Sequence, residues 1–453
     1  MPWWDRLQRA LFAALAVGLA WGIRGDFGHV IGAMYPGAVL ALALAYTSGR
    51  ASLFVRMPVL AALSAGAIGA GGTMSYGILH GYAQSDTVLN YGYGFLTLFL
   101  QGGAWGTFAG GLIGLMLDRR PMATGDWLGL LGSVFVGGWM IAFAVISLLG
   151  FHINPPRNDT SIAFIAAALC QFAWLASHRR TTGLRGALLG FLGFGLGMAA
   201  GRMLGNLANV LQEAGHFAIN HWNVMEVSCG FIGGGIFCAG MVDAADPELS
   251  EEEPADTKLA SSLGIVMVLA MIPLWHRLAR IERPSAKLAE WSEALAGYGY
   301  ENPEALAGRI LGGIHGVCAL GFVGAAIWLL IHFRRWRWAS AFPVIWSSLT
   351  MLLYQNFNAL YFLYPSESGR INMHSVFWGM FGLMSAHVAF VRHRPADSAA
   401  HGRAPWLRWT LAAAIGLSLL ILLSGLINGE QTMRSANTRW PAWSWKDGPF
   451  PGR

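Results

Sequence analysis

The chain has 453 residues, of which 55% are hydrophobic and only 12% are charged. A soluble domain carries roughly a quarter of its residues as charged side chains, so this composition argues against a water-soluble protein and indicates a membrane protein. The formal net charge is +6. Because the basic residues gather in the connections between apolar runs, they indicate membrane topology and no nucleic-acid partner, and membrane lipids are the expected partners.

The apolar runs repeatedly approach the length that an α-helix needs to cross a bilayer, about 20 residues. They predict an all-α, polytopic transmembrane bundle of about 13 spans, with ends uncertain by a few residues. The predicted spans are 9–24, 29–48, 57–80, 93–117, 127–150, 160–177, 184–208, 223–243, 259–276, 310–332, 339–362, 373–391 and 407–427.

Arginine pairs fall in every second connection between these spans, as an odd number of spans requires. Basic residues stay on the cytoplasmic side during insertion, so the N-terminus is predicted inside and the C-terminus outside. We expect a multi-pass protein of a bacterial inner membrane. The arginines that set this orientation are Arg6 and Arg9, Arg50 and Arg56, Arg119 and Arg120, Arg179 and Arg180, Arg334, Arg335 and Arg337, and Arg392 to Arg408.

The spans divide into two membrane halves. Residues 1–243 form the first half with spans one to eight, and residues 259–427 form the second half with spans nine to thirteen. An acidic cytoplasmic linker at 244–258 is expected to join them. The outer connection at 277–309 is predicted to hold a short interfacial helix, and residues 428–453 a tryptophan-rich outer tail.

A weak internal repeat connects the two halves. Asn223 to Gly233 opens the eighth span and Asn372 to Gly382 opens the twelfth, and the two segments share Asn, Val, Gly and Gly in register. This match suggests three parallel four-helix repeats followed by one further helix. Glycine-rich membrane helices also match by chance, so a bundle without repeats stays open.

The six residues from Arg24 to His29 end the first apolar segment early and place three ionisable side chains below the outer interface. These are Arg24, Asp26 and His29. Charged groups at membrane depth are expensive and typically mark a functional site. The alternative is that Arg24 and Asp26 merely neutralise each other at a tight turn between two helices.

A polar stripe follows one face of the seventh predicted span. Arg202, Asn206, Asn209, Glu213 and His216 recur at spacings of four, three, four and three, which keeps them on one side of a continuous helix. Such a face cannot point at lipid. It lines either a cavity or a polar contact between helices.

Further polar groups occur at similar depth on other spans. Glu226 lies near the start of the eighth span and His80 near the end of the third. Gln355 and Asn358 belong to the eleventh span, and Arg370 and His374 lead into the twelfth. In the predicted topology all of them lie in the outer third of the bundle, so we expect them to share a cavity that opens to the outside.

This set of groups predicts carboxylate acid/base chemistry. A carboxylate beside an arginine stays ionised and can act as a base or nucleophile, whereas one in an apolar site can act as an acid. We expect an enzyme that hydrolyses or transfers a group on a glycan or lipid-linked substrate, with Asp26, Glu226 and Glu213 as catalytic candidates. The candidates for substrate binding are Arg24, His29, His80, Arg202, Asn206, Asn209, Gln355, Asn358, Arg370 and His374.

Two other functions use the same residues. A multi-pass transporter of a small polar or anionic solute would have its site near the midplane, where only Arg202 and His315 come close. A non-catalytic subunit of a membrane complex would use the polar groups as helix contacts. No metal or cofactor is expected, because the spacing of His216, His221 and Glu226 takes them off one helix face and no known cofactor motif occurs in a suitable setting.

Overall fold

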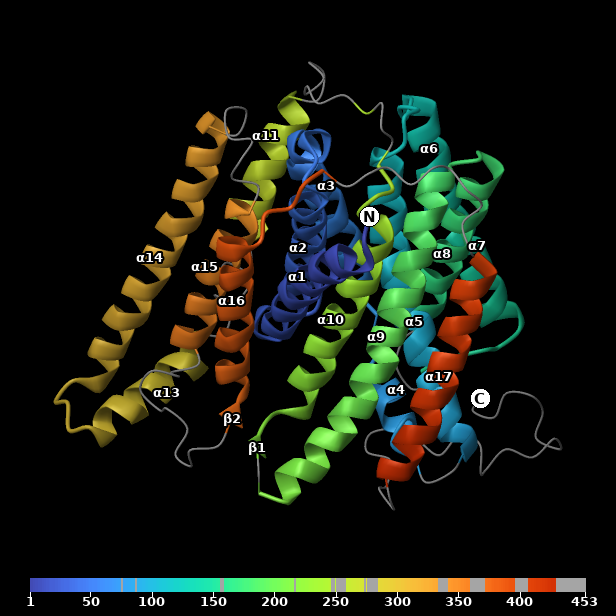
Figure 1. The fold of residues 1–453 in the computed structure, drawn as a ribbon. Coiled ribbons are helices and arrows are strands. Elements are labelled where there is room, and N and C mark those ends of the chain that lie inside the picture. Colours follow the sequence, from blue (N-terminus) through green and yellow to red (C-terminus); the bar gives the residue numbers. More distant parts are fainter. Residues whose placement is uncertain are drawn as a thin grey trace.

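A computed structural model describes residues 1–74, 76–85, 88–154, 159–215, 217–245, 249, 258–272, 274, 284–332, 341–358, 371–395 and 406–428. Within these ranges it leaves undescribed the side chains of residues 26–27, 88, 217–218, 284–287, 356–358, 371–372 and 427–428. The described part is a bundle of helices, with one pair of two-residue strands (Figure 1). The predicted fold class, an all-helical apolar bundle, is therefore confirmed at this level.

Each predicted span coincides with helical structure. The first half contains α1 (Trp3–Ile23), α2 (Val30–Ser48), α3 (Ala51–Gly71), α5 (Val88–Met116), α6 to η3 (Thr124–Leu148), α8 (Thr160–Ser177), α9 (Thr181–Glu213) and α10 (His221–Met241). The second half contains α11 with η5 (Lys258–Met271), α14 (Pro303–His332), α15 (Phe342–Asn358), α16 (Met373–Phe390) and α17 (Trp406–Asn428).

Eight helices in the described part are long and apolar enough to cross a membrane. The count of 13 spans and the orientation therefore stay predictions. The eight candidates are Val30–Ser48, Ala51–Gly71, Thr124–Leu148, Thr160–Ser177, Thr181–Glu213, His221–Met241, Pro303–His332 and Trp406–Leu426.

The third predicted span is shorter than expected. It does not run on to residue 80, because α3 ends at Gly71 and a separate short helix, α4 (Gly77–Tyr82), begins after a turn. The break lies where the chain passes very close to neighbouring groups. A Cβ atom at Gly71 would lie 1.7 Å from Trp105, and one at Gly72 would lie 2.1 Å from the carbonyl oxygen of His29. Only glycine fits at such a close approach.

The connection before the tenth predicted span contains a helix where the sequence predicted an interfacial one. This is α13 (Pro284–Gly297), whose Trp291 and Leu295 are buried against Ala307. The next helix, α14, contains the predicted span 310–332 and begins seven residues before it, running without interruption from Pro303 to His332. Proline has no N–H to leave unpaired in the first helical turn, which explains why this helix starts there and not at residue 310.

Glycine contacts hold α5, α9, α10 and α1 together in a row of antiparallel neighbours (Figure 1). Between α5 and α9, a Cβ atom at Gly190 would lie 1.9 Å from the carbonyl oxygen of Gly106. Between α10 and α1, a Cβ atom at Gly230 would lie 2.4 Å from the carbonyl oxygen of Val17. Lipid supplies no hydrophobic force between helices, so this close backbone packing stabilises the bundle.

We expect that replacing Gly106 by alanine separates α5 from α9, because the new Cβ atom would lie 2.0 Å from the carbonyl oxygen of Gly190. Overpacking of a tight contact typically costs about 1–3 kcal/mol of unfolding free energy. Thermal unfolding of the purified protein in detergent measures this loss. Gly92 is the matched control on the same helix, because its Cβ position has open space and Gly92→Ala is expected to change the midpoint little.

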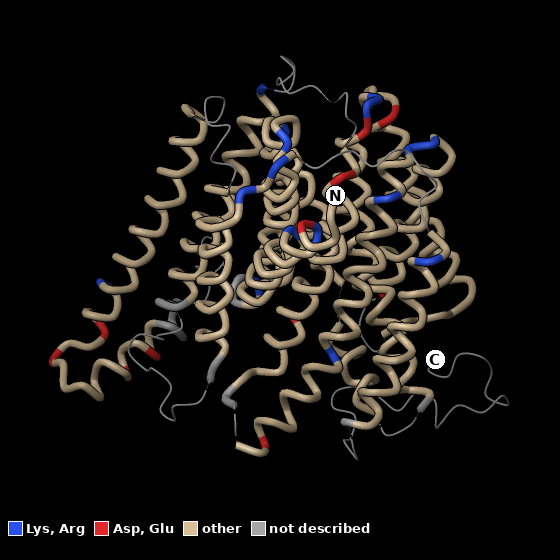
Figure 2. The backbone as a smooth tube through the Cα atoms, viewed as in Figure 1, with Lys and Arg blue, Asp and Glu red and all other residues tan. Residues whose placement is uncertain are grey.

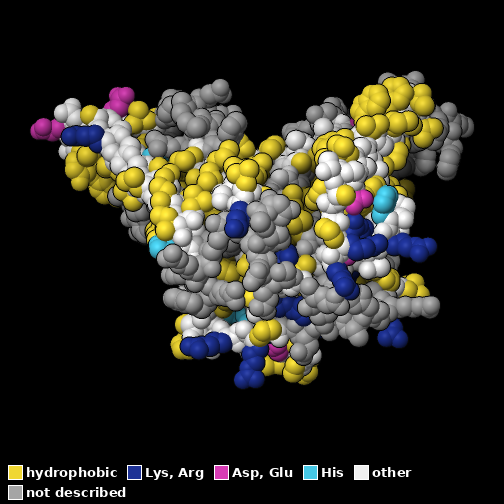
Figure 3. Space-filling model, turned by 90° about the horizontal axis from the view of Figure 1, so that it is seen from above, with side chains coloured by type: hydrophobic (Ala, Val, Ile, Leu, Met, Phe, Trp, Pro, Cys, Tyr) yellow, Lys and Arg dark blue, Asp and Glu magenta, His cyan; other side chains and the backbone are white. Residues whose placement is uncertain are grey.

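Basic side chains gather at one end of the bundle, the upper end in Figure 1. Figure 2 shows most Lys and Arg in the upper half, and Figure 3, which looks onto that end, shows many basic and few acidic side chains. Some of them join helix ends there. The carboxylate of Asp243, just after α10, accepts hydrogen bonds from Nη2 of Arg6 in α1 at 2.6 Å and from Nη2 of Arg185 in α9 at 2.8 Å.

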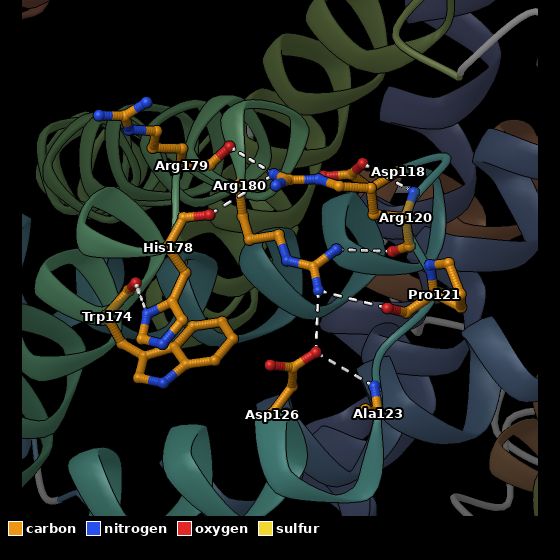
Figure 4. Close-up of polar contacts among 9 residues, drawn as sticks. All are labelled: Asp118, Arg120, Pro121, Ala123, Asp126, Trp174, His178, Arg179 and Arg180. Carbon is orange, nitrogen blue, oxygen red and sulfur yellow. Dashed lines mark hydrogen bonds and ion pairs between the residues drawn. The ribbon is translucent and has the colours of Figure 1, made fainter.

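Two turns at this basic end hold each other through arginines (Figure 4). Arg180 donates to the carbonyl oxygens of Arg120 at 2.6 Å and Pro121 at 3.3 Å, and it pairs with Asp126 at 3.0 Å. Arg120 in turn donates to the carbonyl oxygen of Arg179 at 2.8 Å. The arginines that set the predicted topology therefore also satisfy carbonyl groups in the turns that follow α5 and α8.

The two strands join the approaches to α10 and α16 at the opposite end. β1 (Phe217–Ala218) and β2 (Ile371–Asn372) pair in parallel, with Ala218 opposite Asn372. Helix α1 then lies against both helices, since a Cβ atom at Gly18 would meet Met380 at 3.0 Å and Phe231 at 3.1 Å. Both residues follow the asparagine of the predicted repeat by eight positions (223 to 231, 372 to 380). The repeat itself stays a prediction.

Candidate functional site

A buried ion pair joins the end of α1 to the start of α10. Arg24 begins the 3-10 turn η1 (Arg24–Phe27), and its Nη2 lies 2.8 Å from Oε1 of Glu226. The Arg24 side chain is 1% exposed and that of Glu226 is 9% exposed. Removing two charges from water is costly, so a pair at this depth needs further stabilising partners.

Tyr76 and aromatic rings provide those partners. Arg24 Nη2 donates to the Tyr76 hydroxyl at 2.5 Å, and that hydroxyl donates to Oε1 of Glu226 at 3.1 Å. The guanidinium carbon also lies 5.6 Å from the ring centre of Trp21, 5.7 Å from that of Tyr76 and 5.9 Å from that of Trp105. Cation–π attraction of this kind is worth up to about 2 kcal/mol per desolvated contact.

Glu226 lies at the wall of a cavity of about 600 Å³. Glycines make the space, and a Cβ atom at Gly25 would lie 3.0 Å from Oε2 of Glu226. The cavity is built from the ends of α1 and α3 and the starts of α2, α4 and α10. Its lining residues are Gly22, Gly25, His29, Gly72, Thr73, Met74, Tyr76, Gly77, Trp222, Asn223 and Glu226.

Two tryptophans lie on the inner side of this site. Trp21 precedes Arg24 by one helical turn, and both Trp21 and Trp105 are fully buried. Their rings meet edge to face with centroids 5.6 Å apart, and Phe194 lies 5.3 Å from Trp21. Aromatic side chains therefore fill the bundle on the side of the ion pair that faces the bundle centre. We call these three residues the aromatic floor (Trp21, Trp105 and Phe194).

A second polar layer lies beside the cavity and joins α4, α9 and α17. In α9, Nη1 of Arg202 lies 3.4 Å from Nδ1 of His80. Its other terminal nitrogen, Nη2, donates to Oδ1 of Asn206. Asn206 Nδ2 donates to Oγ of Ser424 at 3.1 Å. Arg202, His80 and Asn206 are each at most 2% exposed.

Two aromatic rings connect this layer to the cavity. The imidazole of His80 lies 4.9 Å from the ring of Trp222 and 5.7 Å from that of Tyr76. Both of those rings line the cavity. The structure therefore brings Arg24, Glu226, His80 and Arg202 into one neighbourhood, although they come from four different helices and turns.

Of the other predicted site residues that the structure describes, His29 lines the cavity and the rest lie away from it. On α9, Asn209 is half-buried and Glu213 is exposed, so the polar stripe starts in the core and ends at the surface. His29 is exposed and lines the cavity. Gln355 is buried in α15 and His374 is half-buried in α16, and neither lines the cavity.

Several predictions fall on groups that the structure does not describe. These are the side chains of Asp26 and Asn358, and residues His216 and Arg370. The backbone of Asp26 belongs to η1, next to Gly25 of the cavity. Among the described residues, no group of three or more His, Cys, Asp or Glu side chains has the arrangement of a metal site.

Arg24 has a partner that local spacing did not suggest. The sequence suggested Asp26, two residues away, whose side chain the structure does not describe, and the structure pairs Arg24 with Glu226, 202 residues further along the chain. Arg202 contacts His80 and Asn206. Local spacing cannot reveal such a pair. Equal predicted depth of the two charges in their membrane segments was the only available signal.

Four aromatic residues and one serine of the site were not predicted as site residues. Tyr76, Trp21, Trp105 and Trp222 surround the ion pair and His80, and Ser424 completes the Asn206 contact. Tryptophan is frequent at membrane interfaces, so its positions alone did not separate these from the other tryptophans. Tyr76 and His80 do stand one turn apart in the sequence, and they lie together in the structure.

A second cavity, of about 470 Å³, lies at the basic end. It is lined by residues that include Tyr46, Arg50, Arg392 and His393, and no carboxylate belongs to its described lining. Burial, together with the charge of Arg9, lowers the pKa of His393 to about 3. This cavity therefore offers a neutral imidazole and arginines, but no base or nucleophile comparable to Glu226.

No family model, no curated protein and no solved structure matches the chain. The fold and the chemistry of the site are therefore the observations from which a function can be argued.

Proposed function

We propose that this integral membrane protein is an enzyme that acts on a glycan or lipid-linked substrate at the outer end of the bundle. The observation that carries the proposal is Glu226, which Arg24 and Tyr76 hold at the wall of a cavity, next to the buried rings of the aromatic floor. A buried ionisable group in a cleft with a defined charge partner is the usual arrangement of a catalytic residue.

In this proposal Glu226 is the base or nucleophile. Arg24 stabilises the ionised carboxylate, and both Arg24 and Tyr76 approach Oε1, the oxygen on the buried side. Oε2 faces Gly25 of the cavity. A carboxylate oriented in this way can take a proton from a hydroxyl group, or it can attack an anomeric carbon, whose bond to the leaving-group oxygen breaks as the new bond forms. Asp26, two residues after Arg24, is the candidate for a second carboxylate.

The lining of the cavity suits a sugar-bearing substrate. The rings of Tyr76 and Trp222 offer flat apolar faces, while His29 and Asn223 offer hydrogen bonds to hydroxyl groups. Binding sites of this kind combine apolar walls with a few placed polar groups. Because the cavity lies among helix ends, the lipid portion of a substrate can remain in the membrane.

A transporter is the main alternative, and the aromatic floor weighs against it. Alternating access needs a site that both sides reach in turn, usually near the midplane. Here Trp21 and Trp105 are fully buried between the ion pair and the bundle centre. A transport cycle would have to separate those rings, whereas chemistry at the outer end leaves them in place.

We expect the Glu226→Gln variant to lose turnover by about 10²–10⁴-fold, the usual contribution of a general base. The purified protein in nanodiscs is incubated with a lipid extract of its expression host, and sugar-bearing lipids are followed by mass spectrometry. The wild type is expected to convert at least one such lipid. Asp26→Asn, tested in parallel, decides whether the second carboxylate takes part.

Glu301→Gln is the matched control, since this carboxylate is exposed in the connection between α13 and α14. It is expected to keep full turnover. Conversion of the same lipids at the wild-type rate by Glu226→Gln, with normal folding, would remove Glu226 from the reaction. A wild type that converts nothing but lets a labelled solute cross proteoliposome membranes would favour the transporter.

A further inference from the structure

Arg202 is a buried cation without a counter-ion. Its side chain is 1% exposed, and within the described part of the chain no carboxylate lies within ion-pair distance of it. The two groups that its terminal nitrogens meet, His80 Nδ1 and Asn206 Oδ1, are both uncharged acceptors. Its Nε has no hydrogen-bond partner. An uncompensated charge at this depth costs several kcal/mol unless an anion joins it.

The hydrogen-bond pattern fixes the protonation state of His80. Arginine has only N–H donors, so Arg202 can donate to His80 Nδ1 only if that nitrogen carries no proton. The proton of the neutral ring is then on Nε2, which makes Nε2–H a donor. This Nε2 is buried and has no hydrogen-bond partner. Arg202 Nε and His80 Nε2–H are therefore two buried donors that find no hydrogen-bond partner among the described residues, which is a costly arrangement without a ligand.

We infer that Arg202 and His80 form an oxyanion subsite that takes a phosphate group. The guanidinium supplies the charge and the directional donors that phosphate oxygens prefer, and His80 Nε2–H supplies a further donor. One net positive charge matches the single negative charge of a phosphodiester. Asn206, held by Ser424, keeps Arg202 in place.

The subsite lies next to the proposed reaction centre. The rings of Trp222 and Tyr76 lie 4.9 Å and 5.7 Å from the imidazole of His80, and both line the cavity of Glu226, so a phosphate group would reach Arg202 from this cavity after a movement of Trp222. Trp222 is half-buried in the first turn of α10. The inference rests on the proposed function for its meaning, because it makes the substrate a phosphate-bearing, lipid-linked glycan. Phosphate binding itself can be tested without it.

The test measures binding of inorganic phosphate to the full chain in detergent, with thermal unfolding as readout and chloride at equal ionic strength as reference. We expect a saturable rise of the unfolding midpoint for the wild type. Arg202→Gln is expected to lower the affinity for phosphate about 10–100-fold, the usual effect of losing charge-assisted hydrogen bonds. Arg202→Lys, which keeps the charge, is expected to bind with intermediate affinity.

Glu226→Gln separates the two proposals, because it is expected to abolish turnover and to keep phosphate binding. The same measurement in phosphatidylglycerol nanodiscs distinguishes two kinds of ligand. If inorganic phosphate still binds there, the natural ligand is a soluble phosphate ester. If the lipid prevents phosphate binding, the natural ligand is a lipid headgroup. No saturable midpoint shift in the wild type would overturn the subsite. The same holds if Arg202→Gln and Arg202→Lys both bind phosphate as the wild type does.

Discussion

Replacement of Arg24 by methionine is expected to destabilise the protein by about 3–5 kcal/mol, the typical cost of breaking a buried ion pair. Glu226 would keep its charge but lose the partner at 2.8 Å, and the cation–π contacts with Trp21, Tyr76 and Trp105 would be lost too. Methionine fills most of the space of the arginine side chain. The loss of unfolding free energy therefore comes more from the missing charge than from missing volume. Thermal and denaturant unfolding in detergent measure it.

The double variant Arg24→Met/Glu226→Gln tests whether the pair itself is responsible. Without Arg24, a neutral glutamine is cheaper to bury than a carboxylate, so the double variant is expected to be more stable than Arg24→Met alone. Glu226→Gln alone is expected to cost less than Arg24→Met, because its amide oxygen can still accept from Arg24. Additive losses would mean that Arg24 and Glu226 contribute independently.

Replacement of Trp105 by alanine is expected to cost about 3–5 kcal/mol, as for other large-to-small changes in a core. The ring is fully buried, contacts Trp21 at 5.6 Å and Tyr76 at 6.0 Å, and occupies the space left by Gly71. Its removal would deepen the outer cavity toward the bundle centre. Unfolding measurements give the energy, and ion leak through proteoliposomes reports whether the floor has opened.

Two variants serve as controls for this loss. Trp105→Phe keeps a ring over Arg24 and is expected to lose less stability than Trp105→Ala. Trp139 in α7 (Gly138–Phe143) is 66% exposed, so Trp139→Ala is expected to change stability little. If Trp105→Ala unfolds at the same midpoint as Trp139→Ala, the floor is not a structural element of the site.

Much of the helical architecture could be predicted from the sequence, because hydropathy alone determines where a chain can cross lipid. Residue spacing was informative as well, as the polar stripe on α9 shows. Its spacing predicted one continuous helix face, and Arg202, Asn206, Asn209 and Glu213 do lie on α9. Where the prediction failed, at the end of α3, the cause was a close approach of Gly71 and Gly72 to residues distant in sequence.

The site was predictable only in part. Depth placed Arg24, Glu226, His80 and Arg202 at one end of the bundle, and the structure brings these four together. Their pairing depends on how α1, α4, α9 and α10 pack, and that packing is set by glycine contacts between helices. Equal depth alone cannot show that Arg24 pairs with Glu226, nor can it reveal that Tyr76 contacts both the ion pair and His80.

The proposed function depends on a cavity that contains Glu226 and opens only to the outer side of the membrane. Single cysteines at Asn223 in the cavity, Glu301 at the same end and Thr124 at the basic end can be labelled with a membrane-impermeant maleimide in vesicles of both orientations. We expect the maleimide to label Asn223→Cys from the same side of the membrane as Glu301→Cys, and to label Thr124→Cys from the opposite side. Labelling of Asn223→Cys from the side of Thr124, or from both sides, would contradict it.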